Sequence, residues 1–454
     1  MVIKDKIMFK EHPKGLYILF FTEMWERFSY YGMRAILTLY MYRQVTGDNP
    51  GLGWDEAFAL SIYGWYTMAV YVMSIPGGII ADRWLGQKKT VLLGGILLIF
   101  GHSILAIDAM WAFAAGLTLI VLGVGGLKPN ISTMVGGLYR EGDPRRDHGF
   151  TIFYIGINIG AALASLVVGG VGEIYGWHYG FGLAGIGMFL GMLVFFYGNK
   201  YLKNVGDPPK LRTDTKTQIK SPLTKIEKDR MVVLFLSFLI IIAFWAAFEQ
   251  AGGLMNIYTD SKVDRMLLGW QIPTSWFQFF NPFFIMVFGT FVATFWLKRQ
   301  RANKEASTLF KMAIGTIIMG TGFLMMSGAS LQAASVGKAG MYWIIVAYLL
   351  FTIGELCASP TALSFITKLA PAKYGSLMMG SYFAATGLGN KVAGLLGESA
   401  SRAGELQVFT GIFIFTVIFG ILLLVFLKKL KALTHGAEDI IEDELEIAVE
   451  PDIA

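Results

Sequence analysis

The chain has 454 residues, of which 55% are hydrophobic and only 15% are charged, and it contains 54 Gly, 35 Phe and 22 Met. Soluble domains do not carry this balance, so the composition predicts an integral membrane protein. The formal net charge is +6, but the basic residues lie in short loops between apolar runs, which is typical of membrane topology rather than nucleic-acid binding. The single cysteine, Cys357, excludes an internal disulfide.

The first long apolar segment, expected at 15–42, carries a polar stripe in its middle. The members of this stripe are Glu23, Glu26, Arg27, Tyr30, Tyr31 and Arg34. At about 100° per residue these positions fall on one side of a helix, within an arc of about 140°. Charged side chains at membrane depth face a wet cavity or a protein interior, so the stripe predicts a functional site. The alternative is a set of structural ion pairs that holds a helix bundle together.

Apolar runs along the chain predict twelve membrane-spanning helices, because each run approaches the roughly 20 residues that cross a bilayer. The expected ranges are 15–42, 57–81, 90–107, 111–135, 149–171, 179–198, 229–258, 273–297, 308–328, 341–357, 373–395 and 407–428. The longest polar interruption divides these helices into two groups of six. We expect an all-α membrane fold with six-helix bundles at 1–198 and 229–430, a cytoplasmic linker at 199–228 and an acidic cytoplasmic tail at 431–454.

Basic residues mark one side of the expected membrane. Lys and Arg concentrate next to both termini and in the loops after the second, fourth, eighth and tenth expected helices, whereas the opposite loops carry mainly Asp and Glu. The positive-inside rule then makes both termini cytoplasmic, which agrees with an even number of spans.

The loop after the second expected helix carries the motif Gly78-x-x-Ala81-Asp82-Arg83-x-x-Gly86-x-Lys88-Lys89. Gly86 suits a tight turn, and the Asp82 and Arg83 pair can lock against a neighbouring helix end in one conformation only. The motif resembles the loop signature of the major facilitator superfamily. Without that resemblance, the same residues make an ordinary basic loop.

Seven further motifs follow one another along the membrane region. They are Glu23-x-x-Glu26-Arg27-Phe28-x-Tyr30-Tyr31-Gly32, Gly125-x-x-Lys128-Pro129-Asn130-x-Ser132, Phe153-Tyr154-x-x-Ile157-Asn158-x-Gly160, Trp177-His178-x-Gly180-Phe181, Phe244-Trp245-x-x-Phe248-Glu249-Gln250, Ile272-Pro273-x-x-Trp276-Phe277-Gln278-x-x-Asn281-Pro282 and Gly354-Glu355-x-x-x-Ser359-Pro360. In this order they resemble helix signatures of the proton-dependent oligopeptide transporters, a family of the major facilitator superfamily. The bacterial type of this family implies a multi-pass protein of the inner (plasma) membrane.

The resemblance implies a site that holds the two ends of a short peptide. Arg34 and Lys128 match cations that meet the peptide carboxylate, and Glu355 matches an anion that binds the amine, so that charge-assisted hydrogen bonds of opposite sign fix the orientation. The implied pocket wall comprises Tyr30, Tyr31, Tyr71, Asn158, Asn281, Tyr382 and Thr386. Asn281 and Tyr71 are also interpretable as residues that hydrogen-bond between helices.

A proton is the expected driving ion. The Gly-rich segments match no G-x-x-x-x-G-K-[ST] signature for nucleotide, and a carboxylate that becomes neutral inside a membrane suits a proton. The resemblance implies that Glu249 pairs with Arg34, so that protonating Glu249 frees Arg34 for the peptide carboxylate. Glu23, Glu26, Arg27 and Lys128 form a second expected coupling cluster.

Two departures from the family pattern bear on the expectation. The linker is too short for the two additional helices of many bacterial members, since two spans need about 40 residues. Tyr382 stands where many relatives have a tryptophan, which changes a side-chain pocket.

The sequence thus predicts proton-coupled symport of di- and tripeptides across a lipid bilayer, by a protein that is expected to be monomeric and to need no cofactor, metal or nucleic acid. The alternatives are a proton symporter of another small substrate such as nitrate, a peptide sensor that does not transport, and a membrane-embedded transferase. The last would need a reacting pair such as His and Asp near one face, and we find none in the sequence.

Overall fold

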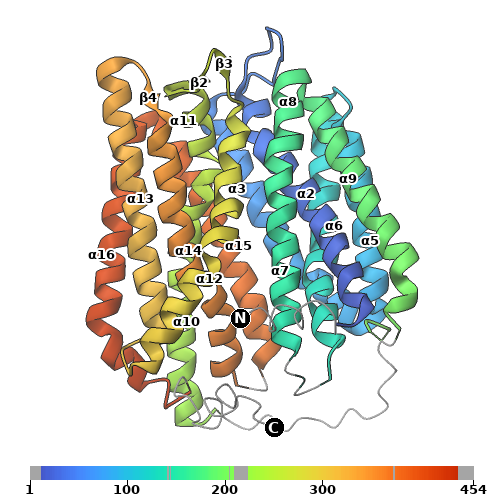
Figure 1. Ribbon diagram of the computed structural model, residues 1–454, viewed down its shortest axis with the longest axis vertical. Helices are drawn as coiled ribbons and strands as arrows, with labels where there is room; N and C mark the ends of the chain where they lie inside the picture. The colour runs from blue at the N-terminus through green and yellow to red at the C-terminus, as the bar shows by residue number, and fades with distance from the viewer. Residues whose placement is uncertain are drawn as a thin grey trace.

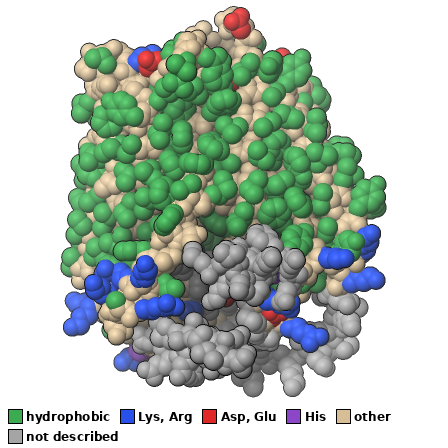
Figure 2. All heavy atoms as spheres, in the orientation of Figure 1, with side chains coloured by type: hydrophobic (Ala, Val, Ile, Leu, Met, Phe, Trp, Pro, Cys, Tyr) green, Lys and Arg blue, Asp and Glu red, His purple; other side chains and the backbone are tan. Residues whose placement is uncertain are grey.

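The computed structural model describes residues 12–140, 143, 145–203, 205–208, 223–371 and 374–437. They form a bundle of long helices that run roughly side by side, with short strands at one end (Figure 1). We call this end the strand end. Lys and Arg side chains gather at the opposite end in Figure 2, and we call it the basic end.

The first half of the chain forms six rods, three of which contain a change of helix type. Their elements are α2 (Lys14–Tyr42), α3 (Glu56–Val72) with α4 (Ser74–Ile80) and η1 (Ala81–Leu85), α5 (Gln87–Leu105), α6 (Met110–Gly137), α7 (Arg145–Leu163) with η2 (Ala164–Gly169) and α8 (Gly170–Tyr175), and α9 (Trp177–Gly198) with η3 (Asn199–Tyr201). The π-helical turn η2 lies within a continuous rod, whereas η1 ends the rod that α3 begins.

The second half forms six more rods. Their elements are α10 (Lys225–Phe248) with η4 (Glu249–Ala251) and α11 (Leu254–Lys262), η5 (Thr274–Phe279) with α12 (Phe280–Arg301), α13 (Thr308–Val336), α14 (Met341–Leu369), α15 (Gly375–Ala403) and α16 (Glu405–Ala432). The strands are β1 (Val263–Asp264), β2 (Met266–Leu267), β3 (Trp270–Gln271) and β4 (Ala339–Gly340). Strand β1 pairs in parallel with β4, and β2 pairs antiparallel with β3.

The twelve rods confirm the predicted number of spans. Among the described residues, ten are long and apolar enough to cross a membrane. Rods α2 and α15 complete the set at 29 residues each, although α2 carries five charged residues and α15 is rich in Gly. In α2 all of the predicted polar stripe except Tyr31 is buried, so its charges are covered by protein rather than by lipid.

Buried apolar side chains form two clusters that follow the order of the chain. The members of one cluster lie between Leu16 and Val205. The members of the other lie between Val233 and Leu423, together with Leu60 from α3. We propose 198 and 229 as the limits of the two bundles. Residues 204 and 209–222 of the expected linker, and 438–454 of the expected tail, lie outside the described residues.

Glycine lets helices from the two bundles approach closely. At the contact between α3 and α15, a Cβ on Gly64 would lie 2.9 Å from the Cα of Gly394. Within the first bundle, a Cβ on Gly77 of α4 would lie only 1.9 Å from the carbonyl oxygen of Gly125 on α6. Backbone therefore packs on backbone at both places.

Gly77→Ala tests this packing. We expect the variant to lose about 1–3 kcal/mol of stability, because the new methyl group has backbone on its opposite side and cannot be accommodated by a rotamer change. Gly78→Ala is the matched control, since a Cβ there meets nothing within 4 Å. Thermal unfolding of both purified variants in detergent measures the difference, and equal midpoints would contradict the close approach.

Candidate transport site

A central cavity lies between the two bundles. Residues from α2, α3, α7, α10, α12 and α14 line it. Six of the predicted site residues meet here: Tyr31, Arg34, Tyr71, Asn158, Asn281 and Glu355. The lining thus holds a cation from the first bundle and a carboxylate from the second.

The cavity wall also contains residues that the sequence analysis did not select. Among them are Tyr154, Trp245, Gln278 and Tyr348. The first three lie inside the quoted motifs, so a signal for them existed in the sequence. Tyr348 lies in an apolar run without a motif, and only the fold brings it to the cavity.

An ion pair beside the cavity joins the two bundles. The Nε atom of Arg34 on α2 lies 3.5 Å from Oε1 of Glu249, and the Tyr63 hydroxyl on α3 donates to the same oxygen at 2.5 Å. Both charged side chains are at least nine-tenths buried. A Cβ at Gly252 would lie 2.1 Å from the Tyr63 hydroxyl and 2.8 Å from Arg34 Nε, so this glycine makes room for the pair. The predicted Arg34–Glu249 pairing is therefore present, and Tyr63 is an addition to it.

A second charged cluster lies about two to three turns earlier on α2. The Nε atom of Arg27 lies 2.9 Å from Glu23 and 2.6 Å from Glu26, and all three side chains are buried. The Arg27 guanidinium also lies 5.9 Å from the ring centroids of Tyr30 and Tyr31. Two carboxylates thus share one guanidinium in a site closed to solvent. This surplus of acceptors suits a group that gains and loses a proton.

The remaining predicted residues fall into distinct positions. Lys128 is not part of the cavity lining; its Nζ lies 3.7 Å from the centroid of the Tyr71 ring, which is part of it. Asn281 donates from Nδ2 to Oε2 of Glu355 at 2.9 Å and to Oγ1 of Thr352 at 3.1 Å, so it links α12 to α14 while it also lines the cavity. Asn158 donates to the carbonyl of Tyr154 in its own helix.

Tyr382 and Thr386 lie on α15, away from this lining. Thr386 is buried and donates to the carbonyl of Tyr382. Tyr382 lines a smaller space, of which Trp245 forms another wall. Trp245 belongs to both linings, whereas Tyr382 belongs only to the smaller one.

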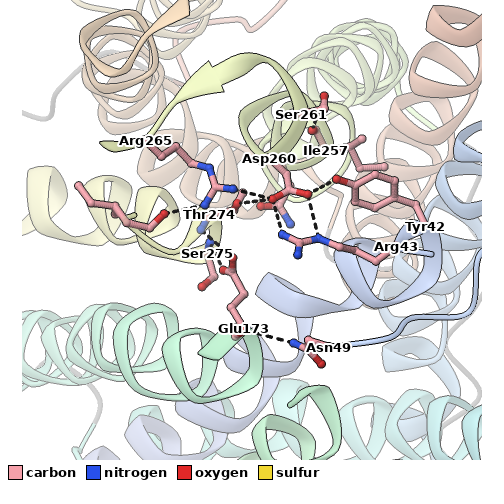
Figure 3. A network of polar contacts seen from close by, with 12 residues as sticks. Tyr42, Arg43, Asn49, Glu173, Ile257, Asp260, Ser261, Arg265, Thr274 and Ser275 are labelled. Atoms are coloured by element: carbon pink, nitrogen blue, oxygen red, sulfur yellow. Dashed lines mark hydrogen bonds and ion pairs between the residues drawn. The ribbon is translucent and has the colours of Figure 1, made fainter. Parts of the chain in front are cut away.

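Polar contacts join the two bundles at the strand end (Figure 3). Asp260 on α11 accepts hydrogen bonds from Tyr42 and Arg43 at the end of α2. Arg265 and Thr274 donate to the same carboxylate from within the second bundle. Because contacts from both bundles meet on one side chain, the structure is closed at this end.

Twelve helices in two bundles around a central polar cavity, with buried ion pairs between the bundles, define a secondary membrane transporter. The chain belongs to the POT family, whose model matches residues 88–225 and 210–406. This confirms the resemblance seen in the sequence and makes the chain a multi-pass membrane transporter rather than an enzyme.

Three individual comparisons support this assignment. The uncharacterized transporter YclF of Bacillus subtilis (strain 168) is 36% identical, covering 94% of this chain and 96% of that protein. A di-/tripeptide transporter of Lactococcus lactis subsp. cremoris is 34% identical, covering 95% and 98%. A solved POT family transporter in complex with a thioalcohol-conjugated peptide is 32% identical with a TM-score of 0.85, covering 93% of this chain and 98% of that one.

Tyr63→Phe tests the addition of Tyr63 to the ion pair. We expect the folded protein to lose about 1.5–3 kcal/mol of stability, because the Tyr63 hydroxyl donates to a charged acceptor that is buried. Tyr66→Phe is the matched control one turn later on α3, since the buried Tyr66 hydroxyl has no hydrogen-bond partner among the described residues. Thermal unfolding in detergent compares the two, and a larger loss in Tyr66→Phe would rule out the assigned role.

Proposed function

We propose that this protein imports di- and tripeptides together with protons across the bacterial inner membrane by alternating access. The proposal rests on one observation above all: Arg34 and Glu355 line the same buried cavity from opposite bundles. A short peptide is a zwitterion, so a cation and an anion on facing walls hold its two ends whatever its side chains are. The di-/tripeptide transporter of Lactococcus lactis, which aligns over nearly the whole chain, supports this choice of substrate.

The proposed path of coupling runs through Glu249. While this carboxylate is ionised, it occupies Arg34; once it is protonated, Arg34 is released toward the peptide carboxylate. Glu23, Glu26 and Arg27 provide a second place to hold a proton on the same helix. Lys128 lies over the face of the Tyr71 ring, which lines the cavity. In this proposal its charge acts on the peptide carboxylate from behind Tyr71.

The other parts of the proposal concern assembly and orientation. We propose a monomer that needs no cofactor other than the proton gradient. The basic end faces the cytoplasm together with both termini, because α12 alone places Lys298, Arg299 and Arg301 in its last turn there. The strand end, which is closed in this structure, then faces outward. Substrate preference also depends indirectly on Tyr30, Tyr382 and Thr386, which support residues of the cavity wall.

Glu249→Gln tests the coupling. In liposomes with an imposed inward proton gradient, uptake of labelled dialanine is expected to fall to the level of protein-free liposomes, while exchange of internal for external dialanine continues. The expectation follows because glutamine binds no proton but leaves the cavity in place. Glu405→Gln, at the start of α16 and away from the cavity lining, is the control and should transport normally. Uphill uptake by Glu249→Gln with an unaltered proton dependence would contradict the proposed coupling through Glu249.

Glu355→Ala tests recognition of the amine and separates peptide from nitrate. The half-saturating concentration of dialanine is expected to rise about 30-fold or more, since truncating one partner of a buried charge pair costs about 2–5 kcal/mol. Propionyl-alanine has the same length as dialanine but no amine. It should therefore bind equally weakly to the parent protein and to Glu355→Ala. Excess unlabelled nitrate should not compete with dialanine. Uptake of nitrate that is indifferent to Glu355→Ala would favour the alternative substrate.

A further inference from the structure

A groove between α12, α13 and α14 opens on the outer surface of the second bundle. Among the described residues its lining is hydrophobic apart from Arg299, near the basic end of α12. On α13 it is lined by Phe310, Ile314 and Ile318, whose spacing of four residues puts them on one face of the helix. In Figure 1, α12 and α13 both lie beside α14. No described residue lines both this groove and the transport cavity, so the two are separate.

The groove exists because α12 is poorly covered by its neighbours. In the most apolar stretch of this rod 17% of the residues are buried, against at least 33% in each of the other nine candidate spans. All of α12 is described, and Trp296 is the only buried residue of its basic-end half. The Trp296 ring meets the edge of Phe310 on α13, with 6.0 Å between centroids. Phe291 and Phe295, which also line the groove, are 69% and 56% exposed, so the groove is open to the surrounding membrane.

The groove has the depth of one leaflet of a bilayer. Phe291 lies ten residues before Arg301, the last residue of α12, and Ile318 lies ten residues after Thr308, the first residue of α13. At 1.5 Å per residue, both lie about 15 Å from the basic end of their rods. The hydrocarbon core of a bilayer is about 30 Å thick, so the groove extends from the basic end to about the middle of the membrane. This length suits one acyl chain of a lipid whose headgroup lies at the basic end.

Two cations lie where the groove meets the basic end. The guanidinium of Arg299 lies 5.2 Å from the ring centroid of Phe310. The Nζ atom of Lys311 lies 5.7 Å from the ring centroid of Trp296. Aromatic rings of the groove wall therefore hold both cations beside its mouth.

The positive charge of Arg299 is not neutralised by a described carboxylate. Its Nε donates to the backbone carbonyl of Glu305 at 2.7 Å, which orients the guanidinium. The Glu305 carboxylate itself contacts Lys431 at 3.3 Å and accepts from the backbone N–H of Ser307 at 2.9 Å. Within the described part of the chain Arg299 makes no ion pair, so its charge is available to an anion from outside the protein.

We propose that this groove binds an anionic phospholipid, with one acyl chain between α12, α13 and α14 and its phosphate on Arg299 and Lys311. A guanidinium binds phosphate through paired N–H donors, and basic sites between helices at the cytoplasmic side attract anionic headgroups. A membrane lipid carries an apolar chain and a phosphate at the spacing that the groove requires. A soluble anion lacks the chain.

The bound chain would lie behind the rod that carries Glu355. Ile353 and Cys357 line the groove, and each is two residues from Glu355, which lines the transport cavity. Two residues correspond to about 200° around a helix, so the two linings use opposite faces of α14. The site does not depend on which substrate the cavity carries.

Native mass spectrometry of the full-length protein in detergent tests the site. The purified protein is titrated with dioleoyl phosphatidylglycerol, which is anionic, and with dioleoyl phosphatidylcholine, which has the same chains but no net charge. We expect the parent protein to bind one phosphatidylglycerol about tenfold more tightly than phosphatidylcholine. Inorganic phosphate at the same concentration should not displace the lipid, because it has no chain.

Arg299→Gln tests the headgroup contact. The affinity for phosphatidylglycerol is expected to fall about tenfold or more, because a hydrogen bond to a charged group is lost. The affinity for phosphatidylcholine should change less. Arg299→Lys keeps the charge and should retain part of the preference. Arg301→Gln, an exposed basic residue in the same turn and outside the groove lining, is the matched control and should bind as the parent does.

Ile314→Trp tests the chain contact from α13, and Val292→Phe tests it independently from α12. Each larger side chain occupies space that the acyl chain would need, so the affinities for both lipids are expected to fall about fivefold or more. Thermal unfolding without added lipid selects the variants that fold as the parent does.

The lipid site is overturned if the parent protein does not prefer phosphatidylglycerol, if phosphate displaces the lipid, or if Arg299→Gln binds it as tightly as the parent does. It is equally overturned if Arg301→Gln matches the loss in Arg299→Gln. Unchanged affinities in the folded groove-filling variants would show that no chain enters the groove.

Discussion

The structure depends on how ionised side chains are kept inside a membrane. A charge at this depth is costly unless an opposite charge or several hydrogen bonds accompany it. The chain meets this constraint in two ways. Arg27 is paired with Glu23 and Glu26 on its own rod, whereas Arg34 is matched only when the second bundle brings Glu249 to it. The need for compensation therefore couples the relative position of the bundles to the protonation of a few carboxylates.

The polar contacts between the bundles are arranged in two levels. Near the cavity, Arg34, Glu249 and Tyr63 form a pair that a substrate carboxylate and a proton can replace. At the strand end, Asp260 accepts hydrogen bonds from Arg43 and Arg265, and Glu173 on α8 accepts hydrogen bonds from the backbone at the start of η5. Neither carboxylate belongs to the cavity lining. The ion pair beside the cavity and the contacts at the strand end are thus made by different carboxylates.

Much of the fold follows from the sequence, because apolar length and the Lys and Arg pattern depend on local composition alone. The polar stripe of α2 was likewise predictable from helical periodicity, and its partners Glu249 and Glu355 came from motif resemblance. Tyr63 and Tyr348 could not be found in this way, since each lies in an apolar run outside the motifs and its role depends on which rod lies opposite. Glu173 appears in the sequence as an acidic loop residue, and its backbone partners are invisible without the fold. Lys128 was expected at the pocket wall, and the structure places Tyr71 in front of it.

The contact between Gly64 and Gly394 has a mechanical consequence. At this point the bundles touch through bare backbone, and the Leu60 side chain of α3 packs beside it against Gly397 of α15. Gly64 lies eight residues from the strand-end start of α3 but 21 residues from Leu85, where that rod ends. If the bundles rock about this fulcrum, its arms are unequal, so a small parting at the strand end accompanies a larger sweep at the basic end. Cargo then passes the wider opening at the basic end more easily, in both directions, than the narrower opening at the strand end.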